Sequence, residues 1–234
     1  MTVLTKDIIH QIIQAVKTAK LFGIESFILE PNIIRGIDET RSVAIFDNNI
    51  TFDINYSIGI NRLDILVNRL TVFNSIENFS VDCIIDEKIN EARSLVIKAD
   101  RVKVEYKCAR IKAIQAPKTI EDTRKYKLEI SEDIANLFIK ADSAMRAETM
   151  NISCNDDVVT YEFVDSNNDV FQYESTLKAV NLVNDNFVNF RHKYSVKLIM
   201  LAIKHNNTGN FYITNKGMFN ADVNGINVYI ISKQ

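Results

Sequence analysis

Apolar residues recur at the spacing of an amphipathic α-helix in four segments of this chain. These segments are 4–20, 60–72, 131–146 and 195–205. Thr5 and Ser131 stand at the starts of the first and third segments. Each hydroxyl can accept a hydrogen bond from a free backbone N–H of the first helical turn, so both residues are expected to be N-caps. The pattern therefore predicts four helices, two in each half of the chain.

Short runs rich in β-branched and aromatic residues predict strands between the helices. In the first half they are 25–30, 32–38, 42–47 and 50–56 before the second helix, and 79–86, 92–99 and 101–108 after it. In the second half they are 149–155, 157–165, 169–177 and 187–194 before the fourth helix, and 209–215, 218–224 and 226–233 after it. Both halves therefore have the order helix, strands, helix, strands.

This repeated order predicts an α+β protein of two tandem domains, although sequence identity between the halves is low. The expected domains are 1–110 and 128–234. The segment 111–127 contains a proline, many charged residues and no clear period, so we interpret it as an interdomain connector. A structureless segment of this length is long for a loop inside one domain.

Composition favours a soluble globular protein, because 47% of the 234 residues are hydrophobic and 25% are charged. The three cysteines are widely spaced and form no CxxC pair, which favours a reducing compartment. No apolar run approaches the roughly 20 residues that cross a bilayer, and the N-terminus does not resemble a secretion signal. We therefore expect a cytoplasmic protein that does not enter membranes.

Enzymatic motifs are not evident. His10, His192 and His205 occur in no HExxH arrangement, and the six glycines form no phosphate-binding loop. The acidic clusters 155–157 and 165–169 lack the ligand spacing of a calcium loop, so we interpret them as hairpin turns. We expect no catalytic residue, no cofactor and no metal. Any catalysis would need residues that are dispersed through the sequence.

Basic residues occur at matching places in the two halves. Arg62 and Arg69 are seven positions apart in the second helix, and Lys197 and Lys204 have the same spacing in the fourth. Seven residues make about two turns, so each pair is expected to occupy one stripe. The helices carry a net charge of +4, which leaves −6 on the remainder because the chain totals −2. A single basic residue is usually just solvated, so only the recurrence favours a basic helical face that binds an acidic partner.

Tandem units in this order resemble the DNA polymerase sliding clamps. The segments that carry the resemblance are LTKDI (4–8), ISEDIANLFIKADSAMRAETMNIS (130–153) and the stretch from NFRHKY to NVYII (189–231). They are most similar to the trimeric processivity clamps of T-even-like bacteriophages, and more distantly to proliferating cell nuclear antigen. The third predicted helix differs from the family, because it is net acidic.

The resemblance implies a ring with curved antiparallel sheets outside and helices lining the bore. Three chains would close it around duplex DNA. It implies a non-enzymatic processivity factor in DNA replication whose partners are double-stranded DNA of any sequence, a DNA polymerase, an ATP-driven clamp loader and further copies of itself. If the protein is viral, it would act in the cytoplasm of a bacterial host. The DNA-facing residues would be Lys6, His10, Lys17, Lys20, Arg62, Arg69, Lys140, Arg146, Lys197 and Lys204.

Two further surfaces follow from the resemblance. Subunits would join through edge strands that contain Val102, Val104 and Tyr106 in one chain and Val170, Phe171 and Tyr173 in its neighbour. These could equally be ordinary internal strands. Partner peptides would bind beside the connector and the last strand, at Ile114, Ala116, Pro117, Ile120, Tyr229 and Ile231. The connector residues could instead dock back onto their own domain.

Two other functions remain open from the sequence. A structural or assembly protein of two tandem α+β domains, such as a virion component, would show the same duplication. An enzyme with a dispersed active site is the third hypothesis.

Overall fold

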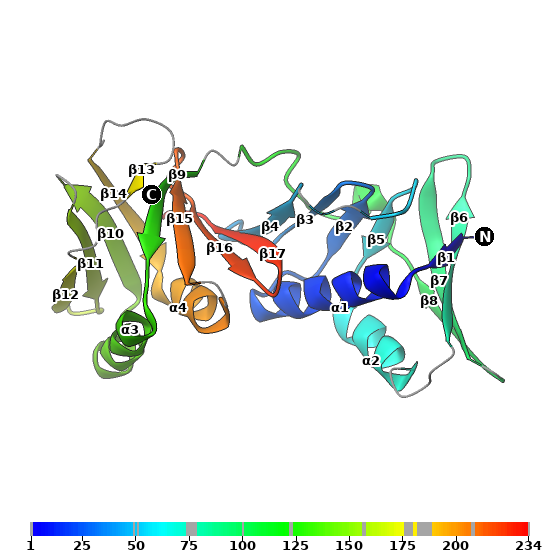
Figure 1. Cartoon of the computed structure of the whole chain (residues 1–234), viewed down its shortest axis with the longest axis horizontal. Coiled ribbons are helices and arrows are strands. Elements are labelled where there is room, and N and C mark those ends of the chain that lie inside the picture. The colour runs from blue at the N-terminus through cyan, green and yellow to red at the C-terminus, as the bar shows by residue number, and fades with distance from the viewer. Residues whose placement is uncertain are drawn as a thin grey trace. The chain divides into compact units, whose positions relative to one another are not determined.

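The computed structural model describes residues 2–48, 50, 52–73, 79–99, 101–121, 124–155, 158–175, 180–181, 189–206 and 209–233 (Figure 1). The chain divides into two units. Unit 1 comprises Met1–Glu39 and Ala44–Lys118, and unit 2 comprises Thr40–Val43 and Thr119–Gln234.

Unit 1 contains two groups of antiparallel strands. The first has the order β1 (Thr2–Leu4), β6 (Ser80–Asp86), β7 (Glu91–Ala99) and β8 (Val102–Lys107). The second has the order β4 (Val43–Asp47), β3 (Ile33–Ile37), β2 (Phe27–Glu30) and β5 (Ile58–Ile60). Strand β8 is therefore the edge of the first group.

The helices of unit 1 are α1 (Lys6–Leu21) and α2 (Leu63–Phe73), with a 3₁₀ turn η1 at Ile111–Ala113. The Thr5 hydroxyl caps α1 by accepting a hydrogen bond from the Ile8 N–H (3.3 Å). Helix α1 buries an apolar stripe that includes Ile12 and Val16. Helix α2 packs against α1, β7 and β8, and Figure 1 shows the two helices side by side.

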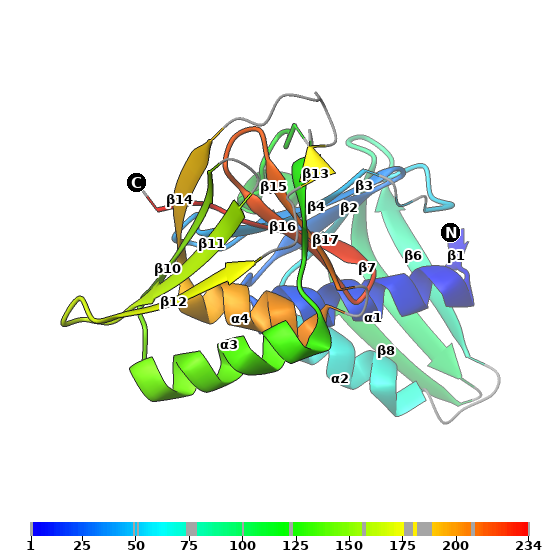
Figure 2. The ribbon, with the colours of Figure 1, turned by 60° about the vertical axis from the view of Figure 1, so that its left-hand side comes forward.

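Unit 2 repeats this plan. One group of strands has the order β12 (Val170–Ser175), β11 (Val158–Val164), β10 (Thr149–Asn155) and β14 (Phe190–Ser195). The other has the order β13 (Val180–Asn181), β9 (Arg124–Glu129), β15 (Asn210–Thr214), β16 (Phe219–Val223) and β17 (Ile226–Ile230). Helices α3 (Glu132–Met145) and α4 (Val196–His205) lie side by side beneath the strands in Figures 1 and 2.

Aromatic packing joins α3 to its sheet. The ring of Phe138 is fully buried, and its centroid lies 5.0 Å from that of Tyr161, 5.4 Å from that of Phe163 and 5.7 Å from that of Tyr173. Each tilted or edge-on pair of this kind stabilises the fold by about 1 kcal/mol beyond the gain from burying the rings. Helix α3 is thus held although only Phe138 and Ala141 of its residues are buried.

The four predicted helices and the α+β class are confirmed, but three local predictions are wrong. The segment 50–56 forms no strand at its described residues, although Phe52, Ile54 and Tyr56 are buried alternately with exposed neighbours. The Ile54 N–H donates to the Phe52 carbonyl (2.8 Å), so this backbone turns instead of pairing with a strand. Alternating polarity shows which side chains are buried, but it does not show that the backbone forms the hydrogen bonds of a β-sheet.

The other two errors concern boundaries. Helix α2 begins at Leu63, so Arg62 precedes the helix that was expected to contain it. Strand β9 begins at Arg124, inside the segment that was expected to be structureless. The short strands β1, β5 and β13 were not predicted, because runs of two or three residues show no measurable period. Among the described residues, no helix is both long and apolar enough to span a bilayer.

Candidate nucleic-acid interface

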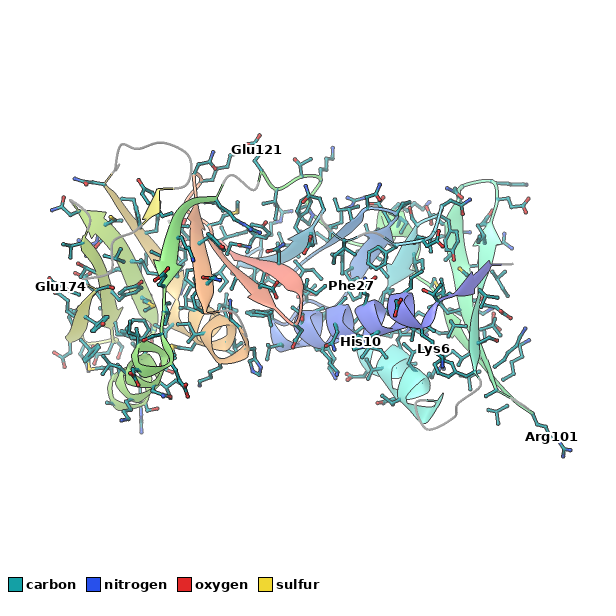
Figure 3. The ribbon with its side chains drawn as sticks, in the orientation of Figure 1. Lys6, His10, Phe27, Arg101, Glu121 and Glu174 are labelled. Carbon is teal, nitrogen blue, oxygen red and sulfur yellow. The ribbon has the colours of Figure 1, made fainter. Side chains whose placement is uncertain are left out.

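The polar face of α1 carries four of the predicted DNA-facing residues. Lys6, His10, Lys17 and Lys20 are all exposed, and at 100° per residue they fall within about 80° of arc. Figure 3 shows Lys6 and His10 projecting from this helix. His10 shares a hydrogen bond with Gln14 (3.1 Å), and Lys20 forms an ion pair with Asp64. The spacing therefore does produce one basic stripe on α1.

The arginines of the α2 region are engaged within unit 1. Arg62 donates from Nη2 to the Lys107 carbonyl oxygen (2.6 Å), and Arg69 donates from Nη1 to the Glu105 carbonyl oxygen. Both acceptors lie on β8. The expected stripe on α2 is thus a pair of side chains that reach across to the neighbouring strand.

The four predicted DNA-facing residues of unit 2 are exposed. Lys140 lies on α3, and Arg146 caps that helix in the left-handed conformation (φ 50°). Lys197 lies in the first turn of α4 and Lys204 in its last. A cation near a helix N-terminus opposes the helix dipole, so Lys197 does not contribute favourably to helix stability. The stability of α4 therefore does not explain why a lysine occupies position 197.

Six of the ten predicted DNA-facing residues make neither an ion pair nor a side-chain hydrogen bond with another residue that the structure describes. They are Lys6, Lys17, Lys140, Arg146, Lys197 and Lys204. Two of the six lie on α1 of unit 1, and the other four lie in unit 2. Their charge is available to an external anion.

The predicted subunit-interface residues lie on two strands that are sheet edges, β8 and β12. Val102 is 49% exposed and Val170 is 54% exposed, whereas Tyr106 is fully buried and its hydroxyl donates to the Asn61 carbonyl. Val104, Phe171 and Tyr173 are half-buried. A strand added at either edge would therefore meet backbone groups and the exposed valines, and would not meet the Tyr106 ring.

The start of the connector is fastened to unit 1. The Arg110 guanidinium lies 3.3 Å from Asp86 Oδ2, and the Ile111 N–H donates to Glu91 (3.2 Å). The absence of a side chain at Gly59 lets the backbone of Ala109 pass close to it, because a Cβ at Gly59 would lie only 2.3 Å from the Ala109 carbonyl oxygen.

The predicted partner-binding residues differ in exposure. Ile114, Ala116 and Pro117 of unit 1 are half-buried, and the Pro117 carbonyl accepts from Arg35 (3.3 Å). In unit 2, Ile120 and Ile231 are half-buried, whereas Tyr229 is only 1% exposed and presents almost no surface.

Sequence reasoning missed a cleft of about 590 Å³ in unit 1. The end of α1, the start of α2 and the first connector residues line it, and its charged side chains are Lys20, Glu25, Arg62 and Asp64. No local pattern could reveal this cleft, because its walls come from segments that are about 40 positions apart in the chain.

Other candidate chemistry is limited. No group of three or more potential metal ligands occurs among the described residues. The turn at 165–169 is confirmed, since Asp165 Oδ1 accepts from the Asn167 and Asp169 N–H groups (2.8 Å each). The cluster at 155–157 lies partly outside the described residues. Burial raises the pKa of the Cys108 thiol to about 12, so this cysteine is not a reactive thiolate at neutral pH.

Comparisons with known proteins bear on the fold. No protein-family model matches the sequence, and no curated protein matches it either. Among solved structures, the chain is similar to Entamoeba histolytica proliferating cellular nuclear antigen, with a TM-score of 0.60, 13% identity and 96% of each chain covered. It is also similar to a structure of the FEN-1 C-terminal region bound to A. fulgidus PCNA, with a TM-score of 0.63, 13% identity and 96% of each chain covered.

A bacterial structure shares the same fold. For the DNA polymerase III subunit beta of Pseudomonas aeruginosa the TM-score is 0.65 at 7% identity, with 100% of this chain and 66% of that chain covered. Identities this low establish architecture alone. The chain has the α+β fold of the DNA clamps.

Proposed function

We propose that this protein is a DNA sliding clamp, which encircles duplex DNA and tethers a replicative polymerase. The observation that carries the proposal is the two-unit clamp fold, which matches a nuclear antigen chain over 96% of both lengths. In this proposal 1–110 and 128–234 are the two clamp domains, and 111–127 is the connector. The protein would have no enzymatic activity of its own.

The proposed ring is a homotrimer, as in the T-even-like phage clamps that the sequence resembles. An ATP-driven loader would open it, and a partner peptide would bind beside the connector. Pairing would join β8 of one copy to β12 of the next, because both are exposed sheet edges.

The exposed basic residues suit this mechanism. Contacts to phosphates attract DNA without regard to sequence and weaken as salt rises. A closed ring holds DNA by topology, so its attraction can be weak enough for the ring to slide. The modest net charge of −2 is compatible with this requirement.

Two measurements test the proposal. Light scattering across a dilution series should give about 80 kDa, three times the chain mass of 26.7 kDa, as expected for a closed cyclic oligomer. With a loader and ATP, the protein should remain on circular DNA through gel filtration and leave when the circle is cut. Retention that does not depend on the circle, or an open-ended assembly, would contradict the clamp and favour a structural role.

A further inference from the structure

The exposed edge of β8 has a defined set of outward backbone groups. The Cys108 N–H donates to the Arg93 carbonyl (2.9 Å), which shows which residues of this antiparallel pair exchange hydrogen bonds. Since the pattern alternates along the ladder, Lys103, Glu105 and Lys107 direct their N–H and C=O groups away from β7. These three residues form the outward edge of β8.

Two of the three outward carbonyls are already occupied. The Arg62 guanidinium binds the Lys107 carbonyl oxygen, and the Arg69 guanidinium binds the Glu105 carbonyl oxygen. Both arginines come from the α2 region, which packs against β8. Hydrogen bonds from a charged donor are stronger than those between neutral groups, so these contacts compete with ordinary ladder bonds.

The local structure holds Arg62 in this position. Its φ of 47° is uncommon for a residue that carries a side chain. The guanidinium carbon lies 5.3 Å from the centroid of the Tyr106 ring, a cation–π distance, and the Asn61 N–H donates to the Tyr106 hydroxyl (3.0 Å). Two contacts therefore fasten Arg62 to β8, a hydrogen bond to Lys107 and the cation–π contact with Tyr106, and the neighbouring Asn61 is fastened to the same strand.

We propose that Arg62 and Arg69 form a clip that guards the β8 edge in the single chain, and that an added strand from a second copy must displace it. This inference rests on the proposed ring. An unprotected edge invites uncontrolled pairing, and arginines that fold back onto the backbone would suppress it. Displacement also releases two guanidinium groups from the backbone carbonyls that they bind.

The expected occupant is β12 of the second copy. The Asp165 N–H donates to the Asp169 carbonyl (3.2 Å), so by the same alternation Val170, Gln172 and Glu174 direct their backbone groups outward from β12. The outward edge of β8 carries two lysines and Glu105, a net positive charge, whereas that of β12 carries one glutamate, so an antiparallel pair can place opposite charges together. Figure 3 shows Glu174 on β12.

The test compares two double variants without DNA. Arg62→Met with Arg69→Met removes the clip and keeps most of the side-chain length. Lys88→Met with Lys112→Met removes the same charge at exposed sites of unit 1 outside β8. Sedimentation should show that loss of the clip tightens self-association about tenfold relative to the control, because two competing hydrogen bonds are gone. Equal or weaker association would overturn the guarding role.

A second readout separates the clip from the ring. In dilute monomer, the carbonyl carbon shifts of Glu105 and Lys107 should change in the arginine variant and stay unchanged in the lysine control. Unchanged shifts in both variants would show that the clip does not form. If neither variant nor the wild type associates at any concentration, both the proposed ring and the proposed role of the clip are contradicted. If wild type and both variants associate equally, only the role of the clip is contradicted.

Discussion

At the scale of single residues, Asp86 joins Arg110, which directly precedes the connector, to Arg93 on β7. It is only 9% exposed, and its Oδ2 lies 3.0 Å from Arg93 Nη2 and 3.3 Å from Arg110 Nη2, while the Lys88 N–H donates to Oδ1 (3.3 Å). The Arg93 guanidinium, aided by Arg110 and the Lys88 N–H, holds the pKa of this carboxyl below its usual range. The charged form of Asp86 therefore stabilises the folded state.

This lowered pKa predicts how stability depends on pH. A carboxyl with a depressed folded pKa stabilises the protein fully above its unfolded pKa, about 4, and loses that contribution as pH falls through the folded pKa. Asp86→Asn should therefore lower the urea midpoint at pH 7, and the difference from wild type should shrink below pH 4. Asp53→Asn, at an exposed site, is the control and should change little. A difference that does not depend on pH would refute this role for the charge.

At the scale of elements, the two units open in the same way. The Ser131 hydroxyl accepts a hydrogen bond from the Ile134 N–H (3.3 Å), as Thr5 does for Ile8. Glu132 and Asp133 add negative charge to the first turn of α3, where the helix dipole favours it. The acidic start of α3 is thus explained by helix stability and carries no information about DNA.

Removal of this cap should have a measurable cost. Ser131→Ala is expected to lower the free energy of unfolding by about 1 kcal/mol, because one N–H of the first turn loses its partner. Ser131→Thr keeps a hydroxyl and should cost less. Urea denaturation, with amide exchange at the first turn of α3, measures both variants. Equal stability of the alanine and threonine variants would show that the cap contributes nothing.

At the scale of the whole molecule, the clamp proposal depends on charge at particular places and not on net charge. Lys197 and Lys204 are exposed on α4, while Lys193 and Lys233 are exposed outside any helix in the same unit. The two pairs therefore allow the same change in net charge at different positions.

Charge reversal should affect DNA retention differently at the two pairs of lysines. Lys197→Glu with Lys204→Glu should shorten retention on circular DNA severalfold. Retention should also depend less on salt, by the amount expected for the loss of about two phosphate contacts, since each contact contributes to the slope of log affinity against log salt concentration. Lys193→Glu with Lys233→Glu should leave retention close to wild type. Retention lifetimes at several salt concentrations provide the measurement. Equal losses in the two variants would mean that α4 does not face DNA.

Local signals correctly predicted the helices and most strands, and they located the basic stripe of α1. They did not predict that Phe52, Ile54 and Tyr56 would be buried in a turning segment, because burial alternates there without strand pairing. They also did not reveal the cleft beside Arg62, whose walls come from distant segments.

The sequence by itself determined the duplicated plan, the start of α1 and α3, and the buried faces of the helices. These features depend on residues within about four positions of each other, where a side chain and a free N–H meet whatever the rest of the chain does. Only the tertiary structure decided that β8 and β12 are edges and that Arg62 and Arg69 bind β8. Those contacts join residues 45 and 36 positions apart, and chain packing alone brings such residues together.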